Sequence, residues 1–180
     1  MAMSPAVRDS VYLLIVGAQL FGMIAMDLVP FYPKSLWEAP TAPLHSITFI
    51  RSTYVSFTSD PFFAHDIHEP WFQAFLYIEA FVQLPLAVYL VYKLSGGRAT
   101  SEAAKELAGL MFGCVTGMGS TTCCYYLLTL GDEMVTPAQK TMLFWGEYLP
   151  YAVIPIIMAF DMHQRLLNRI AVAEARTKDQ

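Results

Sequence analysis

Apolar residues dominate four stretches of the chain, and more polar segments separate them. The stretches run about 11–29, 71–92, 107–130 and 142–162. Each is close to the roughly 20 residues that a helix needs to cross about 30 Å of hydrocarbon. The first is longer than the apolar part of a signal peptide and is followed by no convincing cleavage site, so we interpret it as a true span. The pattern predicts an all-α integral membrane protein, a four-helix bundle forming one domain over residues 1–180.

The connection between the first two spans, residues 30–70, is unusually long. Loops of such length without structure of their own are uncommon and usually act as lids or binding loops. This one contains five aromatic residues between Phe49 and Phe63, too many for a segment that is to remain in water. We therefore expect a cap, helical from about His45 to Thr58, folded over the mouth of the bundle.

Composition supports the membrane assignment. Of the 180 residues 56% are hydrophobic and only 14% are charged, with a mean hydropathy of +0.43, whereas a soluble domain carries roughly 25% charged residues. The net charge of -4 and the lack of a basic block give no reason to expect nucleic acid as a partner. Cys114, Cys123 and Cys124 share one apolar stretch, so no disulfide framework is expected.

The distribution of basic residues predicts the topology. Four spans bring both termini to one side of the membrane. Eight basic residues fall on that side, and three fall on the other: Arg8, Lys93, Arg98, Lys105, Arg165, Arg169, Arg176 and Lys178 against Lys34, Arg51 and Lys140. Under the positive-inside rule both termini are cytoplasmic and the cap is lumenal.

Three carboxylates lie inside the predicted spans at similar depth. Asp27 is near the lumenal end of the first span. Glu79 is roughly 12 Å into the second span and Glu147 roughly 7 to 8 Å into the fourth, at 1.5 Å per residue. Ionisable groups in a membrane span usually mark a functional site. Neighbouring polar groups that could join such a site are Gln83, Tyr126, Tyr148 and Tyr151.

Three interpretations of these acids stay open. Each could be a separate strut that hydrogen-bonds a neighbouring helix. Because buried acids repel one another when ionised, at least one should otherwise be held protonated. A neutral acid beside an ionised one is what general acid/base catalysis requires. The same arrangement would also bind a cationic amine.

A histidine pair in the cap gives a weaker signal. His65 and His68, with Asp66 and Glu69, have a spacing that could bind a metal, but no third ligand follows at a defined spacing. We expect solvated cap residues and no metal. The chain has no glycine-rich phosphate loop and no nucleotide motif, so no cofactor is expected.

Small residues crowd the third span in the stretch GCVTGMGSTTCCYY, residues 113–126. Small side chains allow close helix approach, and they also leave room for a pocket. Packing is the safer interpretation.

The order of several motifs resembles the EXPERA membrane family, most closely its sigma-2-receptor branch. The motifs are MDLVPFYPKSL, then Tyr54 and SDPFF, then EPWFQAFLYIEAFVQLP, and finally EYLPYAVIP. The likeness covers nearly the whole chain. It implies a four-helix protein of the endoplasmic reticulum membrane in which Asp27 and Glu79 line a ligand cavity. It also implies that Gln83 and Tyr151 line this cavity and that Asp60 is a structural acid bracing the cap.

Two positions depart from that resemblance. The family also contains emopamil-binding sterol isomerases, which carry a histidine one turn before the glutamate, where this chain has Phe75. Sterol isomerisation of that type is therefore not expected. Glu147 stands where the receptor branch is apolar, which adds a third acid that simple ligand binding does not need.

Two functions follow. The first is a cofactor-independent enzyme in which Asp27, Glu79 and Glu147 catalyse epoxide opening, cyclisation or isomerisation of a polyene, polyketide, terpenoid or other lipophilic substrate. The second is a receptor or carrier that binds a sterol or lipophilic amine in the same cavity without catalysis. In both, the candidate ligand contacts are Gln83, Tyr54, Tyr126, Tyr148 and Tyr151. Glu147 favours the enzyme, and assembly into a homodimer stays open.

Overall fold

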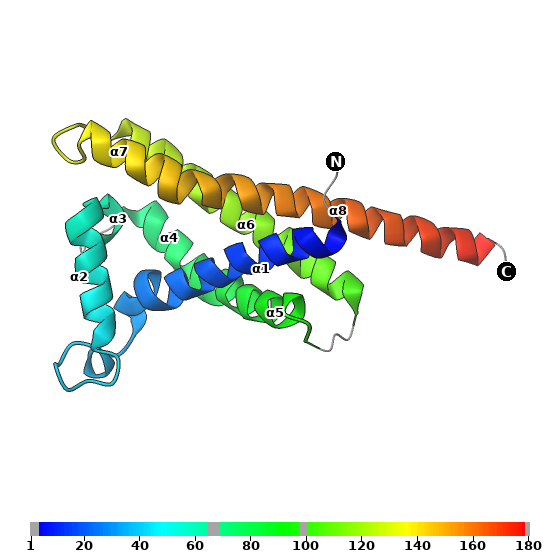
Figure 1. Ribbon diagram of the computed structural model, residues 1–180, viewed down its shortest axis with the longest axis horizontal. Coiled ribbons are helices and arrows are strands. Elements are labelled where there is room, and N and C mark those ends of the chain that lie inside the picture. The colour runs from blue at the N-terminus through cyan, green and yellow to red at the C-terminus, as the bar shows by residue number, and fades with distance from the viewer. Residues whose placement is uncertain (1–3, 65–68, 98–100, 179–180) are drawn as a thin grey trace.

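The computed structural model describes residues 4–64, 69–97 and 101–178, and this part of the chain is helical with no strand. Four helices are long and apolar enough to cross a membrane (Figure 1). They extend over Pro5–Asp27, Pro70–Leu94, Glu102–Thr129 and Pro137–Lys178. Each contains most or all of one predicted span. The predicted all-α membrane bundle is confirmed.

Three of these four helices contain a π-helical turn. Helix α1, Pro5–Gly22, continues into the π turn Met23–Asp27. The second is built from α4, the π turn and α5 in succession: Pro70–Ile78, Glu79–Gln83 and Leu84–Leu94. The fourth is built in the same way from α7, a π turn and α8: Pro137–Leu143, Phe144–Tyr148 and Leu149–Lys178. The third is the uninterrupted α6, Glu102–Thr129.

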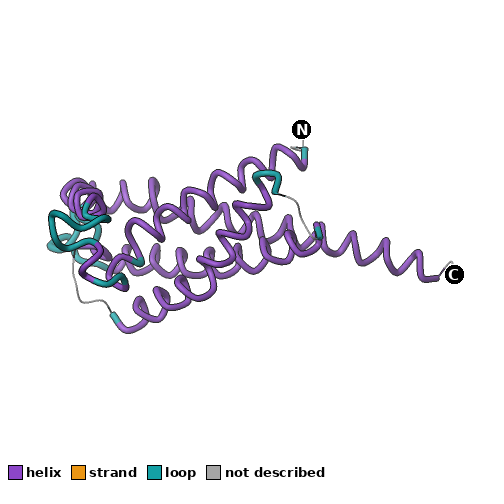
Figure 2. The backbone as a smooth tube through the Cα atoms, turned by 90° about the horizontal axis from the view of Figure 1, so that it is seen from below, coloured by secondary structure: helices purple, strands orange, loops and turns teal. Residues whose placement is uncertain are grey.

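The helices pack as two pairs, α1 along α5 and α6 along α8 (Figure 2). Glycines at every fourth position of α6 let it approach α8 closely: a Cβ on Gly113 would overlap the carbonyl oxygen of Pro155, and one on Gly117 would overlap Ile156. Between the pairs lies an apolar core in which Val16, Leu90 and Phe112 are fully buried. Much of the remaining apolar surface is exposed, as expected of helix faces that meet lipid.

The segment between the first two long helices closes one end of the bundle (Figure 1). It forms two short 3₁₀ turns, Val29–Phe31 and Lys34–Leu36, then α2, Ser46–Thr58, and α3, Pro61–Ala64. Helix α2 begins and ends within one residue of the predicted cap helix. Arg51 of α2 donates a hydrogen bond of 2.6 Å to the Met26 carbonyl, which ties the cap to the end of α1.

The opposite end of the bundle, where both termini lie, is held by ion pairs. Arg8 at the start of α1 pairs with Asp161 of α8, and Arg165 pairs with Asp9 at 2.6 Å. Arg169 pairs with the buried Glu106 of α6. Both termini thus share the end remote from the cap, and its cytoplasmic placement stays a prediction of the charge count.

Candidate ligand-binding pocket

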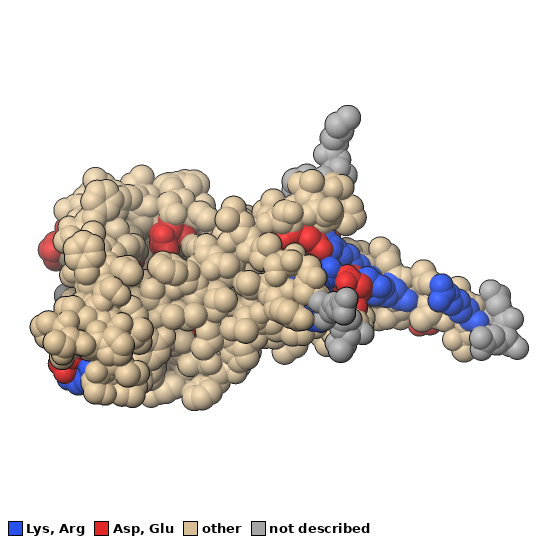
Figure 3. Space-filling model, turned by 60° about the horizontal axis from the view of Figure 1, so that its bottom comes forward, with Lys and Arg blue, Asp and Glu red and all other residues tan. Residues whose placement is uncertain are grey.

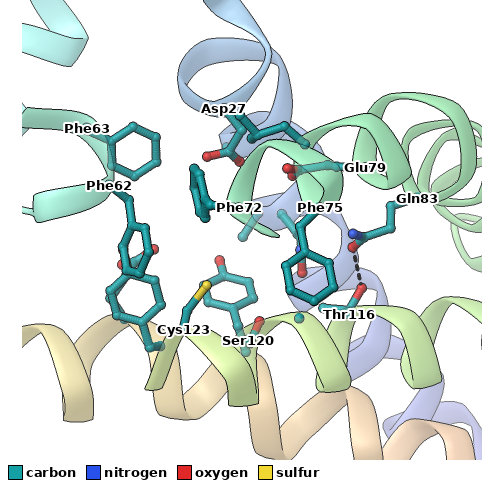
Figure 4. Close-up of a pocket in the computed structure, with 18 residues that line it drawn as sticks. Asp27, Phe62, Phe63, Phe72, Phe75, Glu79, Gln83, Thr116, Ser120 and Cys123 are labelled. Carbon is teal, nitrogen blue, oxygen red and sulfur yellow. Dashed lines mark hydrogen bonds between the residues drawn. The ribbon is translucent and has the colours of Figure 1, made fainter. Parts of the chain in front are cut away.

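A pocket lies beneath the cap and between the helix pairs (Figure 4). Its empty space is about 840 Å³, including the open mouth. Its wall comes from all four long helices and from α3. The polar side chains that line it are Gln19, Asp27, Glu79, Gln83, Thr116, Ser120 and Glu147, and the aromatic ones are Phe62, Phe63, Phe72, Phe75, Tyr148 and Tyr151.

Asp27 and Glu79 meet at one side of this pocket, on helices far apart in sequence (Figure 4). Their carboxyl groups point toward each other (Figure 4). Two ionised carboxylates at such close quarters and away from water repel each other, which favours a state in which one of them holds a proton. Glu79 is 9% exposed, which keeps this proton away from bulk water.

Each of the three predicted acids lies in one of the π turns. Asp27 ends the first, Glu79 begins the second, and Glu147 lies in the third. π turns within α-helices occur frequently at functional sites. A proline follows each turn by two or three residues, at Pro30, Pro85 and Pro150. Because proline disturbs regular α-helical bonding, these prolines are a sequence signal for the turns.

Glu147 lines the pocket from the fourth helix, and it interacts electrostatically with Asp27 and Asp60. No lysine or arginine lines the pocket in the described chain. Arg51 in the cap, outside the pocket wall, is a basic side chain that interacts electrostatically with Asp27. The pocket is therefore an acidic, aromatic chamber without a basic side chain in its wall.

Gln83, one turn along from Glu79, is held by the third long helix. The Thr116 hydroxyl donates a hydrogen bond of 2.8 Å to Gln83 Oε1, and both residues are buried. This bond orients the amide so that its NH₂ group is the part left for a ligand. On the facing wall the buried Oε1 of Gln19 has no hydrogen-bond partner in the described chain.

Asp60 lies outside the pocket wall and connects the cap to the fourth helix. It is fully buried, and its Oδ2 accepts hydrogen bonds from Tyr54 at 2.7 Å and Tyr148 at 2.6 Å. Its Oδ1 accepts from the backbone N–H of Phe62 at 3.0 Å. Burial raises the pKa of Asp60, while these hydrogen bonds oppose the shift. Burial and the neighbouring Asp60 raise the pKa of Tyr54, so its hydroxyl stays protonated and donates.

The structure brings most of the predicted site residues together, but not all of them. Asp27, Glu79, Gln83, Glu147, Tyr148 and Tyr151 line the pocket. Tyr54 lies outside the wall, with its hydroxyl bound to Asp60. Tyr126 also lies outside the wall, where its ring packs against Phe62 and Trp71.

Four lining residues that carry a polar group or a thiol were missed by the sequence reasoning: Gln19, Thr116, Ser120 and Cys123. Gln19 could have been identified from the sequence, because it is a polar residue in an apolar stretch, two turns before Asp27. The other three lie along one side of α6, next to Gly113 and Gly117, which contact α8. The small residues of this span thus serve both suggested purposes, close packing and pocket volume.

The histidine pair considered as a metal site, His65 and His68, lies outside the described residues together with Asp66. Within the described ranges, no group of three or more histidine, cysteine, aspartate or glutamate side chains is arranged to hold a metal ion.

Comparison with known proteins finds a family model that matches this chain and a relative that is similar to it. The family model described as EBP, EXPERA (EXPanded EBP superfamily), matches residues 47–162, which include Asp60, Glu79 and Glu147 but not Asp27. The chain is also 26% identical over 167 residues to the efficient mitochondria targeting-associated protein 19 of Schizosaccharomyces pombe. That alignment covers 93% of this chain and 81% of the relative.

Proposed function

The chain belongs to the EXPERA family, which includes sterol isomerases and sigma-2-like binders, and on this premise we propose a membrane-embedded acid/base enzyme. It takes a lipophilic polyene, polyketide or terpenoid from the bilayer into the pocket under the cap. There it opens an epoxide, or cyclises or isomerises the substrate, without a cofactor. The proposed location is the endoplasmic reticulum membrane.

The observation that carries the proposal is that the carboxyl groups of Asp27 and Glu79 face each other (Figure 4), with Glu147 in the same pocket wall. The pair holds a proton that can be donated, and Glu147 supplies a second carboxylate that can accept one. Positioned donors and acceptors of this kind contribute about 10²- to 10⁴-fold to a rate.

Epoxide hydrolysis illustrates the proposed division of roles. The epoxide oxygen takes the proton held between Asp27 and Glu79, and its carbon–oxygen bond breaks as water adds to the carbon. Glu147 takes the proton that the water releases. Return of that proton to the acid pair restores the site, and the net reaction is addition of water to give a diol. In an isomerisation or cyclisation the pair protonates one carbon and Glu147 removes a proton from another.

The other lining residues suit a substrate that becomes positive during the reaction. The rings of Phe72, Phe75 and Tyr151 border the pocket, and aromatic faces attract cations. The Gln83 amide, fixed by Thr116, can donate to a substrate oxygen. Phe75 itself has no proton to offer, so the acids must supply the proton for any reaction here.

A second candidate function is binding of a lipophilic amine without catalysis. The observation that favours it is the same acidic and aromatic wall without a basic side chain, because an ammonium group would find both opposite charge and ring faces. In this case Asp27 and Glu79 bind the ligand, and Glu147 contributes little.

Purified protein in nanodiscs can separate the two functions. We expect Asp27→Asn, Glu79→Gln and Glu147→Gln each to abolish conversion of a sesquiterpenoid epoxide to its diol, followed by mass spectrometry in isotopically labelled water. The three changes should be non-additive when combined, because groups that act as a unit fail together. Glu38→Gln, in an exposed ion pair of the cap, is the matched control and should leave the rate unchanged.

Binding of a long-chain tertiary amine is measured on the same variants. If Asp27→Asn and Glu79→Gln weaken amine binding while Glu147→Gln changes neither binding nor turnover of a verified substrate, the three-acid mechanism is wrong. Glu147 is then a helix strut and the binding function holds.

A further inference from the structure

A second pocket lies at the end of the bundle remote from the cap, where α1 and α6 begin and α8 runs past them. Its empty space is about 1330 Å³, including a wide opening. Five basic side chains line it: Arg8, Lys105, Arg165, Arg169 and Arg176. Basic side chains gather at this end along α8, with acidic ones beside them (Figure 3). The proposed acid/base site shares no lining residue with this pocket.

Ion pairs account for most of this charge, but not all of it. Lys105 pairs with Asp9 and Glu102, and Arg169 pairs with Glu106. Arg8 and Arg165 share Asp161, and Arg165 also reaches Asp9. The five basic side chains of the pocket are therefore balanced by only four carboxylates, those of Asp9, Glu102, Glu106 and Asp161. Arg176 makes no ion pair with a described residue, so one positive charge remains at the edge of the pocket.

Buried donors in the same pocket also lack acceptors. The Nε atoms of Arg8 and Arg165 are buried and have no hydrogen-bond partner among the described residues. A buried donor left unpaired is costly, and such groups are usually satisfied by water or an ion. Both Nε atoms are closed to solvent, so an anion in the pocket would balance the remaining charge and would not reach these donors.

Apolar residues also lie in and near the wall of the charged pocket. Val172 and Ala173 of α8 are part of its wall. Val7 of α1 and Leu107 of α6, each adjacent in sequence to a lining residue, are 49% and 51% exposed. A ligand that joins an anionic head to apolar chains could contact both the charged pocket and the apolar surface beside it. A soluble anion would contact only the charged pocket.

We propose that this pocket binds the phosphate headgroup of an anionic phospholipid, whose acyl chains lie along the exposed apolar faces of α1 and α6. The position suits such a ligand, because basic pockets between membrane helices at the headgroup level bind anionic lipids. The phosphate oxygens accept from the guanidinium group of Arg176 in the pocket wall and balance its charge. The bound lipid then holds the start of α1, the start of α6 and the extension of α8 together.

The test is lipid retention by the full chain. Protein purified from phosphatidylcholine nanodiscs containing a fraction of phosphatidic acid is examined by native mass spectrometry. Arg176→Gln should lower retained phosphatidic acid about fivefold, the effect of one basic residue near a membrane surface. Asn168→Asp should lower it as well, because it adds a negative charge to the pocket wall. Neither change breaks an ion pair, so the fold should persist.

The matched control is Lys178→Gln, which removes the same charge two residues further along α8, outside the pocket wall. It should retain phosphatidic acid like the wild type. Equal loss in Lys178→Gln and Arg176→Gln would mean general surface attraction and would overturn the proposal. So would glycerol phosphate in solution raising the unfolding temperature as much as the lipid does, since the ligand would then be a soluble anion.

Discussion

The hydroxyl of Tyr148 lies 2.6 Å from Oδ2 of Asp60 and joins two segments that are 88 residues apart. Tyr148 ends the π turn that carries Glu147, and Asp60 lies in the cap directly before α3. The same oxygen accepts a second hydrogen bond from Tyr54 of α2. One buried carboxyl therefore fixes the cap, its two helices and the wall of the pocket relative to one another.

Asp60 should prove structural rather than catalytic. Asp60→Ala removes the acceptor of both tyrosines, and each buried donor left unpaired costs about 1–3 kcal/mol. We expect lower expression and a clearly lower unfolding temperature, measured by fluorescence-detected size exclusion after heating. Tyr54→Phe, which removes one donor and leaves the acceptor partly satisfied, should have a smaller effect. A stable Asp60→Ala protein that loses only turnover would show that this assignment is mistaken.

Close packing of α6 on α8 should depend on Gly113. A Cβ at this position would overlap the backbone carbonyl oxygen of Pro155 and press on Ala159. Both residues belong to the facing helix α8. Overpacking of this kind costs about 1–3 kcal/mol, so Gly113→Ala should lower the unfolding temperature. Gly119→Ala is the control on the same helix, because its Cβ would meet no atom within 4 Å. Equal stability of the two variants would argue against close packing at Gly113.

Arg51 should hold the cap on the end of α1. Its guanidinium donates to the Met26 carbonyl at 2.6 Å and lies 5.9 Å from the centre of the Phe63 ring. Arg51→Gln removes a hydrogen bond from a charged donor, worth about 1.5–3 kcal/mol. We expect faster amide hydrogen exchange throughout α2, measured by mass spectrometry.

Lys34→Gln is the control for this change, because its ion pair with Glu38 is exposed on the same cap. Lys34→Gln should leave amide hydrogen exchange in α2 at the wild-type rate. Unchanged exchange in Arg51→Gln would mean that other contacts suffice to hold the cap.

The topology can be tested with introduced cysteines. Ser35→Cys in the cap should not react with a membrane-impermeant maleimide in sealed microsomes until detergent opens them. Thr177→Cys, at the far end of α8, should react at once, because both termini are predicted to be cytoplasmic. Reaction of Ser35→Cys in intact microsomes would show that the orientation is the opposite of the predicted one.

The sequence by itself determined the helices and their rough lengths. A segment that crosses hydrocarbon must satisfy its backbone internally and must be apolar along its length, so the four spans could be read from hydropathy. The cap helix was equally visible, from the length of its connection and its aromatic residues. The similar depth of Asp27, Glu79 and Glu147 followed from simple rise per residue, but it left open whether they share a pocket or act as separate struts. The resemblance to the EXPERA family supplied the expectation that Asp27 and Glu79 line one cavity.

Only the tertiary structure decided which side chains face that pocket. Tyr54 and Tyr126 were both candidate ligand contacts, but the rotation of their helices directs Tyr54 to Asp60 and Tyr126 to an aromatic cluster. Depth along a helix is fixed by residue number, whereas the direction of a side chain changes by about 100° per residue and shifts again at each π turn. Asp27 and Glu79 are 52 residues apart in the sequence. Their pairing depends in addition on how the two helices that carry them lie side by side (Figure 4). No local pattern specifies that arrangement, because packing of the whole bundle sets it.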